Sequence, residues 1–218
     1  MKARWILLIG LLGVIFLAAC TKTQSDCTDD SCFFEEAVAK SDVSLCRSIV
    51  NPTIEKGCRV EIAIDTEDVR TCRSLDSGYC VDAIAELTRD TELCATIEDA
   101  GWKDTCFGNL AANLSDSNLC RRISSDSSRD GCFGTLAKQQ NDASLCYPII
   151  DMARRDTCII RRAVQQNDSN LCFDITDEVF RANCYYQIAV HTGKPSICNS
   201  ITITYIREQC LLRLNETS

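Results

Sequence analysis

Apolar residues recur along the chain at helical spacing, in two kinds of short segment that alternate. In the first kind, segment A, a cysteine is followed three residues later by Ile or Leu and is usually preceded by an apolar residue. These offsets share one helical face. In six of the seven segments an aspartate four residues before the cysteine is suited to cap the helix, which predicts two to three turns. The segment A cysteines are Cys46, Cys72, Cys94, Cys120, Cys146, Cys172 and Cys198.

Segment B has its own pattern around a second set of cysteines. An apolar residue usually follows the cysteine by four positions, and an alanine follows by five in every segment except the last. This stripe is typical of an amphipathic helix. The recurrent alanine predicts a close approach between helices, since a branched side chain would not fit there. The segment B cysteines are Cys32, Cys58, Cys80, Cys106, Cys132, Cys158, Cys184 and Cys210.

The two segments together form a repeat. From Cys80 to Cys210 the gaps between cysteines alternate between 14 and 12 residues, a period of 26. Self-similarity at a period of this size is typical of stacked-repeat proteins. We therefore predict an all-α solenoid of about seven 26-residue αα-hairpin repeats over 32–218, with one disulfide per repeat. The gap from Cys72 to Cys80 is only 8 residues, which predicts a hairpin loop shortened by about one helical turn.

Two disulfide connectivities use neighbouring cysteines. Pairing each A cysteine with the following B cysteine closes a hairpin, whereas pairing B with the next A joins adjacent hairpins and leaves Cys27 and Cys210 unpaired. The first scheme is favoured, because the A-to-B interval varies while the 14-residue interval is constant. A covalent bond beside a loop tolerates such variation. The favoured pairs are Cys27-Cys32, Cys46-Cys58, Cys72-Cys80, Cys94-Cys106, Cys120-Cys132, Cys146-Cys158, Cys172-Cys184 and Cys198-Cys210.

The first twenty residues read as an export signal. A short basic start precedes an apolar run from Trp5 to Leu17, which is too short to span a bilayer. The stretch Leu17-Ala18-Ala19-Cys20 resembles the lipobox of prokaryotic lipoproteins. That resemblance implies a signal peptide over 1–19, lipidation of Cys20, a tether over 20–31, and an extracytoplasmic location, periplasmic or cell-surface, on a prokaryotic membrane. The alternative is an ordinary signal peptide followed by an unrelated cysteine.

Composition and motifs argue against several functions. The net charge is −8, and −10 without residues 1–19, which disfavours binding to nucleic acid. No Cys-x-x-Cys pair occurs, so neither a metal site nor a cofactor is expected. The single histidine, His191, is placed in a loop, and no Gly-x-Ser-x-Gly segment accompanies it. We therefore expect no enzymatic activity.

A basic residue recurs three positions before five consecutive B cysteines, and we call this set the basic ladder: Lys103, Arg129, Arg155, Arg181 and Arg207. It could bind an anionic polymer. Alternatively, each cation could bind free carbonyls at the end of helix A. An acidic residue follows four of the five cations and would neutralise them locally, which favours the second interpretation. These acids are Asp104, Asp130, Asp156 and Glu208.

The disulfide-closed hairpins are similar in kind to Sel1-like cysteine-rich repeat proteins and to the twin-cysteine hairpins of the mitochondrial intermembrane space. Periods and spacings differ, so the resemblance implies architecture and compartment only. The leading functional hypothesis is a lipid-anchored cell-envelope scaffold that binds a protein or a glycan. A structural spacer is the first alternative, and a hydrolase or carbohydrate-active enzyme is the second.

Overall fold

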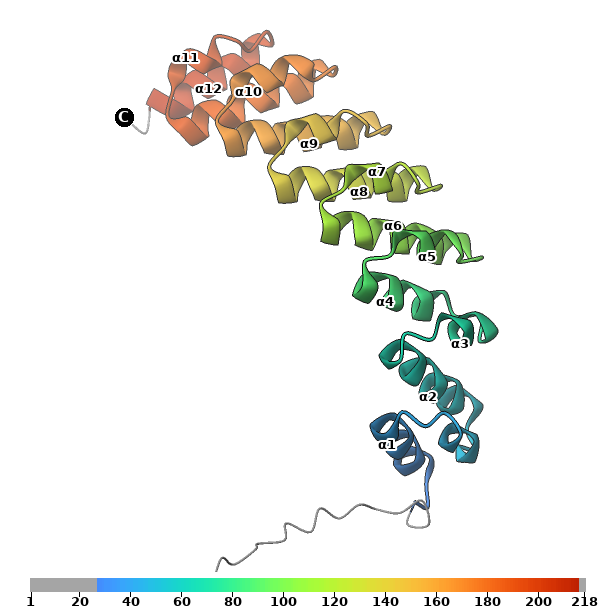
Figure 1. Cartoon of the computed structure of the whole chain (residues 1–218). Coiled ribbons are helices and arrows are strands. Elements are labelled where there is room, and N and C mark those ends of the chain that lie inside the picture. The colour runs from blue at the N-terminus through green and yellow to red at the C-terminus, as the bar shows by residue number, and fades with distance from the viewer. Residues whose placement is uncertain (1–26, 216–218) are drawn as a thin grey trace, which may run out of the picture. The chain divides into compact units, whose positions relative to one another are not determined.

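The computed structural model describes residues 27–215, which form helices and turns without any strand (Figure 1). The predicted signal peptide, Cys20 and most of the predicted tether lie outside the described residues. The chain divides at Cys58 into two compact units. The first contains α1 (Asp30–Lys40), the 3₁₀ helix η2 (Leu45–Ser48) and the start of α2 (Pro52–Asp65).

The second unit alternates short and long helices. The long ones pack on one another in chain order, as Figure 1 shows for α4 to α10, and the pairs continue to α12. The all-α repeat solenoid is thereby confirmed. The short helices are α3 (Val69–Ser74), α5 (Thr91–Ala95), α7 (Ser117–Cys120), η3 (Ala143–Cys146), η4 (Ser169–Asp174) and α11 (Pro195–Cys198). The long helices are α4 (Gly78–Thr88), α6 (Ala100–Leu114), α8 (Asp126–Gln140), α9 (Met152–Gln166), α10 (Glu178–Thr192) and α12 (Thr204–Asn215).

A tight turn explains why the 14-residue interval never varies. At the end of α6, Ser115 adopts the left-handed conformation, and the N–H of Asp116 donates to the carbonyl of Ala111. This is the hydrogen-bond pattern of a Schellman turn. Asp116 then caps α7 by accepting the N–H of Asn118. One residue thus ends the long helix and begins the short one, so no extra residue can be inserted without breaking both caps.

The segment A helices are shorter than expected. They contain four to six residues, about one turn, and some are 3₁₀ helices. After Cys172, for example, Ile175 is already extended and ends η4. Its side chain is 1% exposed, so this residue, three positions after the cysteine, is buried although it lies beyond the last residue of the helix. Burial therefore agrees with the helical pattern, while the predicted two to three turns were wrong.

The recurrent alanine of segment B is buried in every repeat that contains it. Every alanine that follows a B cysteine by five residues is at most 2% exposed. These residues allow neighbouring helices to approach closely, as the sequence pattern predicted. They are Ala37, Ala63, Ala85, Ala111, Ala137, Ala163 and Ala189.

The repeat with the 8-residue interval from Cys72 to Cys80 has a shorter long helix than the next repeat. Helix α4 begins only two residues before Cys80, whereas α6 begins six residues before Cys106. The deletion therefore removes the first turn of the long helix, which corrects the prediction of a shortened loop. Trp102 of α6 packs closely over Gly78, where an added Cβ would lie 2.5 Å from the Trp102 Cβ. Only glycine fits at this position.

Candidate functional site

The structure contains the eight disulfides that close hairpins, and every described cysteine belongs to one of them. Seven join an A cysteine to the next B cysteine, and Cys27 joins Cys32. They are the same pairs that the loop-length argument favours. Because disulfides persist in oxidising compartments, their number indicates an extracytoplasmic environment.

The cations of the basic ladder lie in the first turns of the long helices and mostly bind the protein itself. Arg129 donates to the carbonyl of Ile123 at 3.2 Å. Arg181 and Arg207 make the equivalent bonds, at the same distance, to Ile175 and Ile201. Arg155 instead donates to the Thr176 hydroxyl at 2.9 Å. Within the described part of the chain, Lys103 makes no side-chain hydrogen bond or ion pair. This arrangement agrees with capping of segment A.

The acids next to the ladder hold successive repeats together. Asp104 of α6 accepts the backbone N–H groups of Ser124 and Ser125, just before α8, at 2.8 and 2.9 Å. Asp130 of α8 does the same for Ile150 and Asp151, just before α9. These two aspartates are 6% and 4% exposed. Their interpretation as neutralisers of the ladder was therefore incomplete, because their principal partners are backbone groups of the next repeat.

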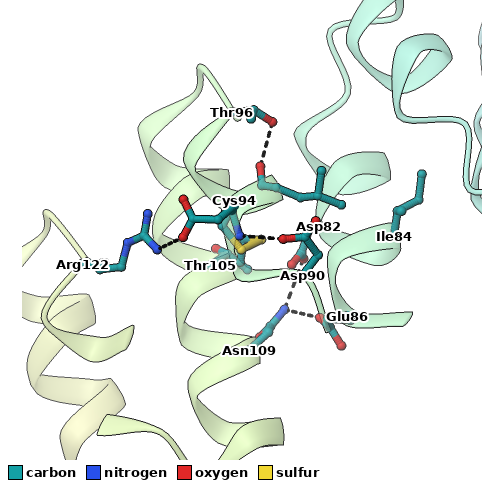
Figure 2. Close-up of a disulfide and its surroundings, with 12 residues drawn as sticks. Asp82, Ile84, Glu86, Asp90, Cys94, Thr96, Thr105, Asn109 and Arg122 are labelled. Carbon is teal, nitrogen blue, oxygen red and sulfur yellow. Dashed lines mark hydrogen bonds and ion pairs between the residues drawn. A yellow bond between two sulfur atoms is a disulfide. The ribbon is translucent and has the colours of Figure 1, made fainter. Parts of the chain in front are cut away.

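A polar cluster lies between α4 and α6, beside the Cys94–Cys106 disulfide. Figure 2 shows the Asn109 amide donating to Asp82 and to Glu86, at 3.2 and 2.7 Å. Burial, and then the negative charge of Glu86, raise the pKa of Asp82 to about 6, although the Asn109 hydrogen bond opposes this shift. This interface therefore presents negative charge at neutral pH.

A groove of about 570 Å³ lies between α8 and α9. We call it the basic groove, because four cationic residues line it. Its walls come from two successive repeats, so the solenoid packing itself forms it. The lining residues are Asp130, Gly131, Gly134, Thr135, Lys138, Ile149, Ala153, Arg154, Thr157, Cys158, Arg161 and Arg162.

Two of the cations have no partner. The side chains of Lys138 and Arg161 are exposed, and neither forms an ion pair or hydrogen bond with any residue in 27–215. Arg154, seven residues before Arg161 and so on the same helical face, donates to the carbonyl and hydroxyl oxygens of Ser127. These bonds leave its positive charge uncompensated.

Arg162 forms a fixed wall of the basic groove. It is 5% exposed, and its guanidinium lies 3.4 Å from the carbonyls of Ala137 and Lys138 and from the Asn141 amide oxygen. Burial, and then the charge of Arg161, lower the pKa of this guanidinium. Arginine remains protonated at neutral pH even so. The buried cation adds to the positive potential of the groove.

Gly131 and Gly134 keep the groove open on the α8 side. Both lie inside a helix with ordinary helical dihedrals, and a Cβ at either position would meet no atom within 4 Å. Glycine in a helix interior is less favourable than alanine by about 0.5–1 kcal/mol. Because neither backbone nor packing requires glycine here, the residues cost stability and leave space for something outside the fold.

The unpaired cations give the groove a positive charge that suits an anionic group. A carboxylate or phosphate is stabilised by unpaired guanidinium and ammonium groups at the edge of a low-dielectric surface. The unpaired cations of the groove, Lys138 and Arg161, are not members of the basic ladder, which stands out in the sequence because it recurs at regular spacing. The visible signal was the seven-residue spacing of Arg154 and Arg161, together with two glycines inside a predicted helix.

The other motifs do not form a site. His191 is exposed in the last turn of α10, so its predicted place in a loop was wrong. No cluster of three metal-ligating side chains occurs within 27–215. Asn113, the first residue of a glycosylation sequon, donates to Glu86. None of the described helices combines the length and the apolar character that crossing a bilayer requires. Comparison with known proteins found no matching family model, curated protein or solved structure.

Proposed function

We propose that the protein is a non-enzymatic, lipid-anchored scaffold of a prokaryotic cell envelope, and that the basic groove binds acidic groups of a protein or glycan ligand. The observation that carries this proposal is the pair of unpaired cations, Lys138 and Arg161, in a cavity of an otherwise acidic chain. The acidic surface repels most polyanions at long range, so the groove would select ligands by local fit. The lipobox-like Leu17-Ala18-Ala19-Cys20 supports the anchor.

Reversal of one groove charge tests the binding site. We expect Arg161→Glu to weaken the binding of oligogalacturonate or polyglutamate to the full mature chain at least tenfold, about 1.4 kcal/mol, because a charge-assisted hydrogen bond is replaced by repulsion. Isothermal titration calorimetry at two salt concentrations measures this. Arg70→Glu on α3 makes the same charge change at an exposed position outside the groove. Equal losses in both variants, or no binding of either polyanion to the wild type, would reject the groove as a binding site.

The anchor is tested at Cys20, which lies outside the described residues. We expect Cys20→Ala to move the protein from the detergent phase to the aqueous phase, or to leave the signal peptide attached. Two acyl chains provide stable anchoring, since each buried methylene contributes about 0.8 kcal/mol. Mass spectrometry of the N-terminal peptide detects the acyl groups. If wild type and variant partition alike and carry no acyl mass, the lipoprotein assignment fails.

A further inference from the structure

The basic groove adjoins a second cavity in the preceding repeat interface, because the two share a lining residue. A cavity of about 290 Å³ lies between α6 and α8, and Thr135 lines both this cavity and the basic groove. The residues on α6 that line it, Thr105, Gly108 and Asn109, occupy the same repeat positions as Gly131, Gly134 and Thr135 on α8. Both cavities lie on equivalent faces of successive helices, and we call the two together, across α6, α8 and α9, the trough.

The two parts of the trough differ in charge. Its α8–α9 part carries the unpaired cations, whereas the polar groups of the α6–α8 part are hydroxyls, the Asn109 amide and the Asp104 carboxylate. That carboxylate already accepts the Ser124 and Ser125 backbone N–H groups. On the α4 side of α6, the amide nitrogen of Asn109 donates to Asp82 and Glu86. Its amide oxygen remains as an acceptor. The acidic α4–α6 interface would repel an anion. An elongated ligand would therefore place its negative group at α9 and a neutral, hydroxylated part over α6.

The lining favours a glycan over a peptide. Peptides are held by free strand edges or by apolar pockets for their side chains. The trough is built from helices, whose backbone N–H groups are already bonded, and its isoleucines, Ile123 and Ile149, are 2% and 4% exposed. Hydroxyl, amide and cationic groups instead match sugar hydroxyls and a uronate carboxylate.

We propose that the trough binds a short acidic oligosaccharide across three successive helices, with a carboxylate between Lys138 and Arg161 and sugar hydroxyls on Thr135 and Asn109. This inference rests on the proposed function, because it names the ligand class of the same groove. Interaxial distances of about 8–10 Å per helix pair give a binding surface roughly 20 Å long, so affinity should increase with ligand length.

The test compares galacturonate with its hexamer by calorimetry on the full mature chain. We expect the hexamer to bind about tenfold more tightly than the monomer, from its added contacts. Gly108→Leu should abolish this advantage and leave monomer binding unchanged. A Cβ at residue 108 lies 3.9 Å from the nearest atom, the Ile123 Cδ1, so a larger side chain would extend into the cavity. Gly57→Leu on α2 is the matched control, and circular dichroism checks that both variants fold.

The possible outcomes separate the two proposals. If Arg161→Glu has no effect on either ligand, the basic groove is not the site and the proposed function fails. If Arg161→Glu weakens both ligands but the hexamer shows no advantage, or Gly108→Leu leaves that advantage intact, the groove stands and the extended trough is rejected. If hexaglutamate binds as tightly as the hexamer and is equally sensitive to Gly108→Leu, the ligand is a peptide and the glycan assignment is overturned.

Discussion

Removal of the Cys146–Cys158 disulfide should destabilise the second unit by about 3 kcal/mol. The bond closes a loop with a sequence separation of 12 residues, and its loss restores the corresponding conformational freedom of the unfolded chain. Each repeat buries few large apolar side chains, so the remaining contacts cannot compensate. Full reduction of all disulfides should therefore abolish cooperative helicity throughout the array. Urea unfolding of the Cys146→Ser, Cys158→Ser double variant measures the free-energy loss.

Hydrogen exchange shows how far the damage spreads. Repeats in a solenoid are stabilised by their neighbours, and α9 packs on both α8 and α10. We therefore expect faster exchange in all three helices of the double variant. The Cys27→Ser, Cys32→Ser variant is the control, since that bond closes a loop with a separation of only 5 residues in the other unit. If exchange rose only between residues 142 and 168, the repeats would be independent, and a rigid trough across three helices would be untenable.

Much of the architecture could be read from the cysteine spacing. The 26-residue period, the Ile buried after six of the seven A cysteines and the buried alanine follow from local pattern, because each helix must bury one face in the same way in every repeat. The length of segment A could not be read in this way. Residues such as Ile175 are buried from an extended conformation just after the helix, so burial alone did not reveal where the helix ends.

The contacts between repeats could not be predicted from the sequence, for a different reason. The partners of Asp104 are backbone N–H groups 20 and 21 residues away, and backbone groups leave no mark in a sequence. Because Lys103 is adjacent in the sequence, the Asp104 carboxylate was interpreted as neutralising the basic ladder. The basic groove was missed similarly, because Lys138 and Arg161 come from different repeats and meet only when α8 and α9 pack. Residues that recur in the repeats build the fold, whereas residues that differ from the repeat pattern, such as Lys138 and Arg161, form the candidate site.

Loss of the Asp104 carboxylate should be the most damaging single substitution outside the cysteines. Both carboxylate oxygens are used by the Ser124 and Ser125 backbone N–H groups, and the Ser124 hydroxyl contributes further hydrogen bonds. Hydrogen bonds to a charged group contribute about 1.5–3 kcal/mol, and unpaired donors add a desolvation penalty. We expect Asp104→Ala to lower the free energy of unfolding by about 3 kcal/mol, and Asp104→Asn to lie between it and the wild type, since the amide keeps one acceptor.

The pH dependence separates this role from a packing effect. Burial acts to raise the pKa of Asp104, but the hydrogen bonds from Ser124 and Ser125 outweigh it and lower the pKa below its ordinary value near 3.8. A carboxylate with a lowered pKa stabilises the fold above its unfolded pKa, and this contribution is lost as the pH falls through its folded pKa. Urea unfolding between pH 7 and pH 3 should show a smaller acid loss in Asp104→Asn than in wild type. Glu98→Gln, at an exposed carboxylate, should match the wild-type stability and pH profile. If Asp104→Ala were as stable as Glu98→Gln, helix packing alone would set the register between repeats.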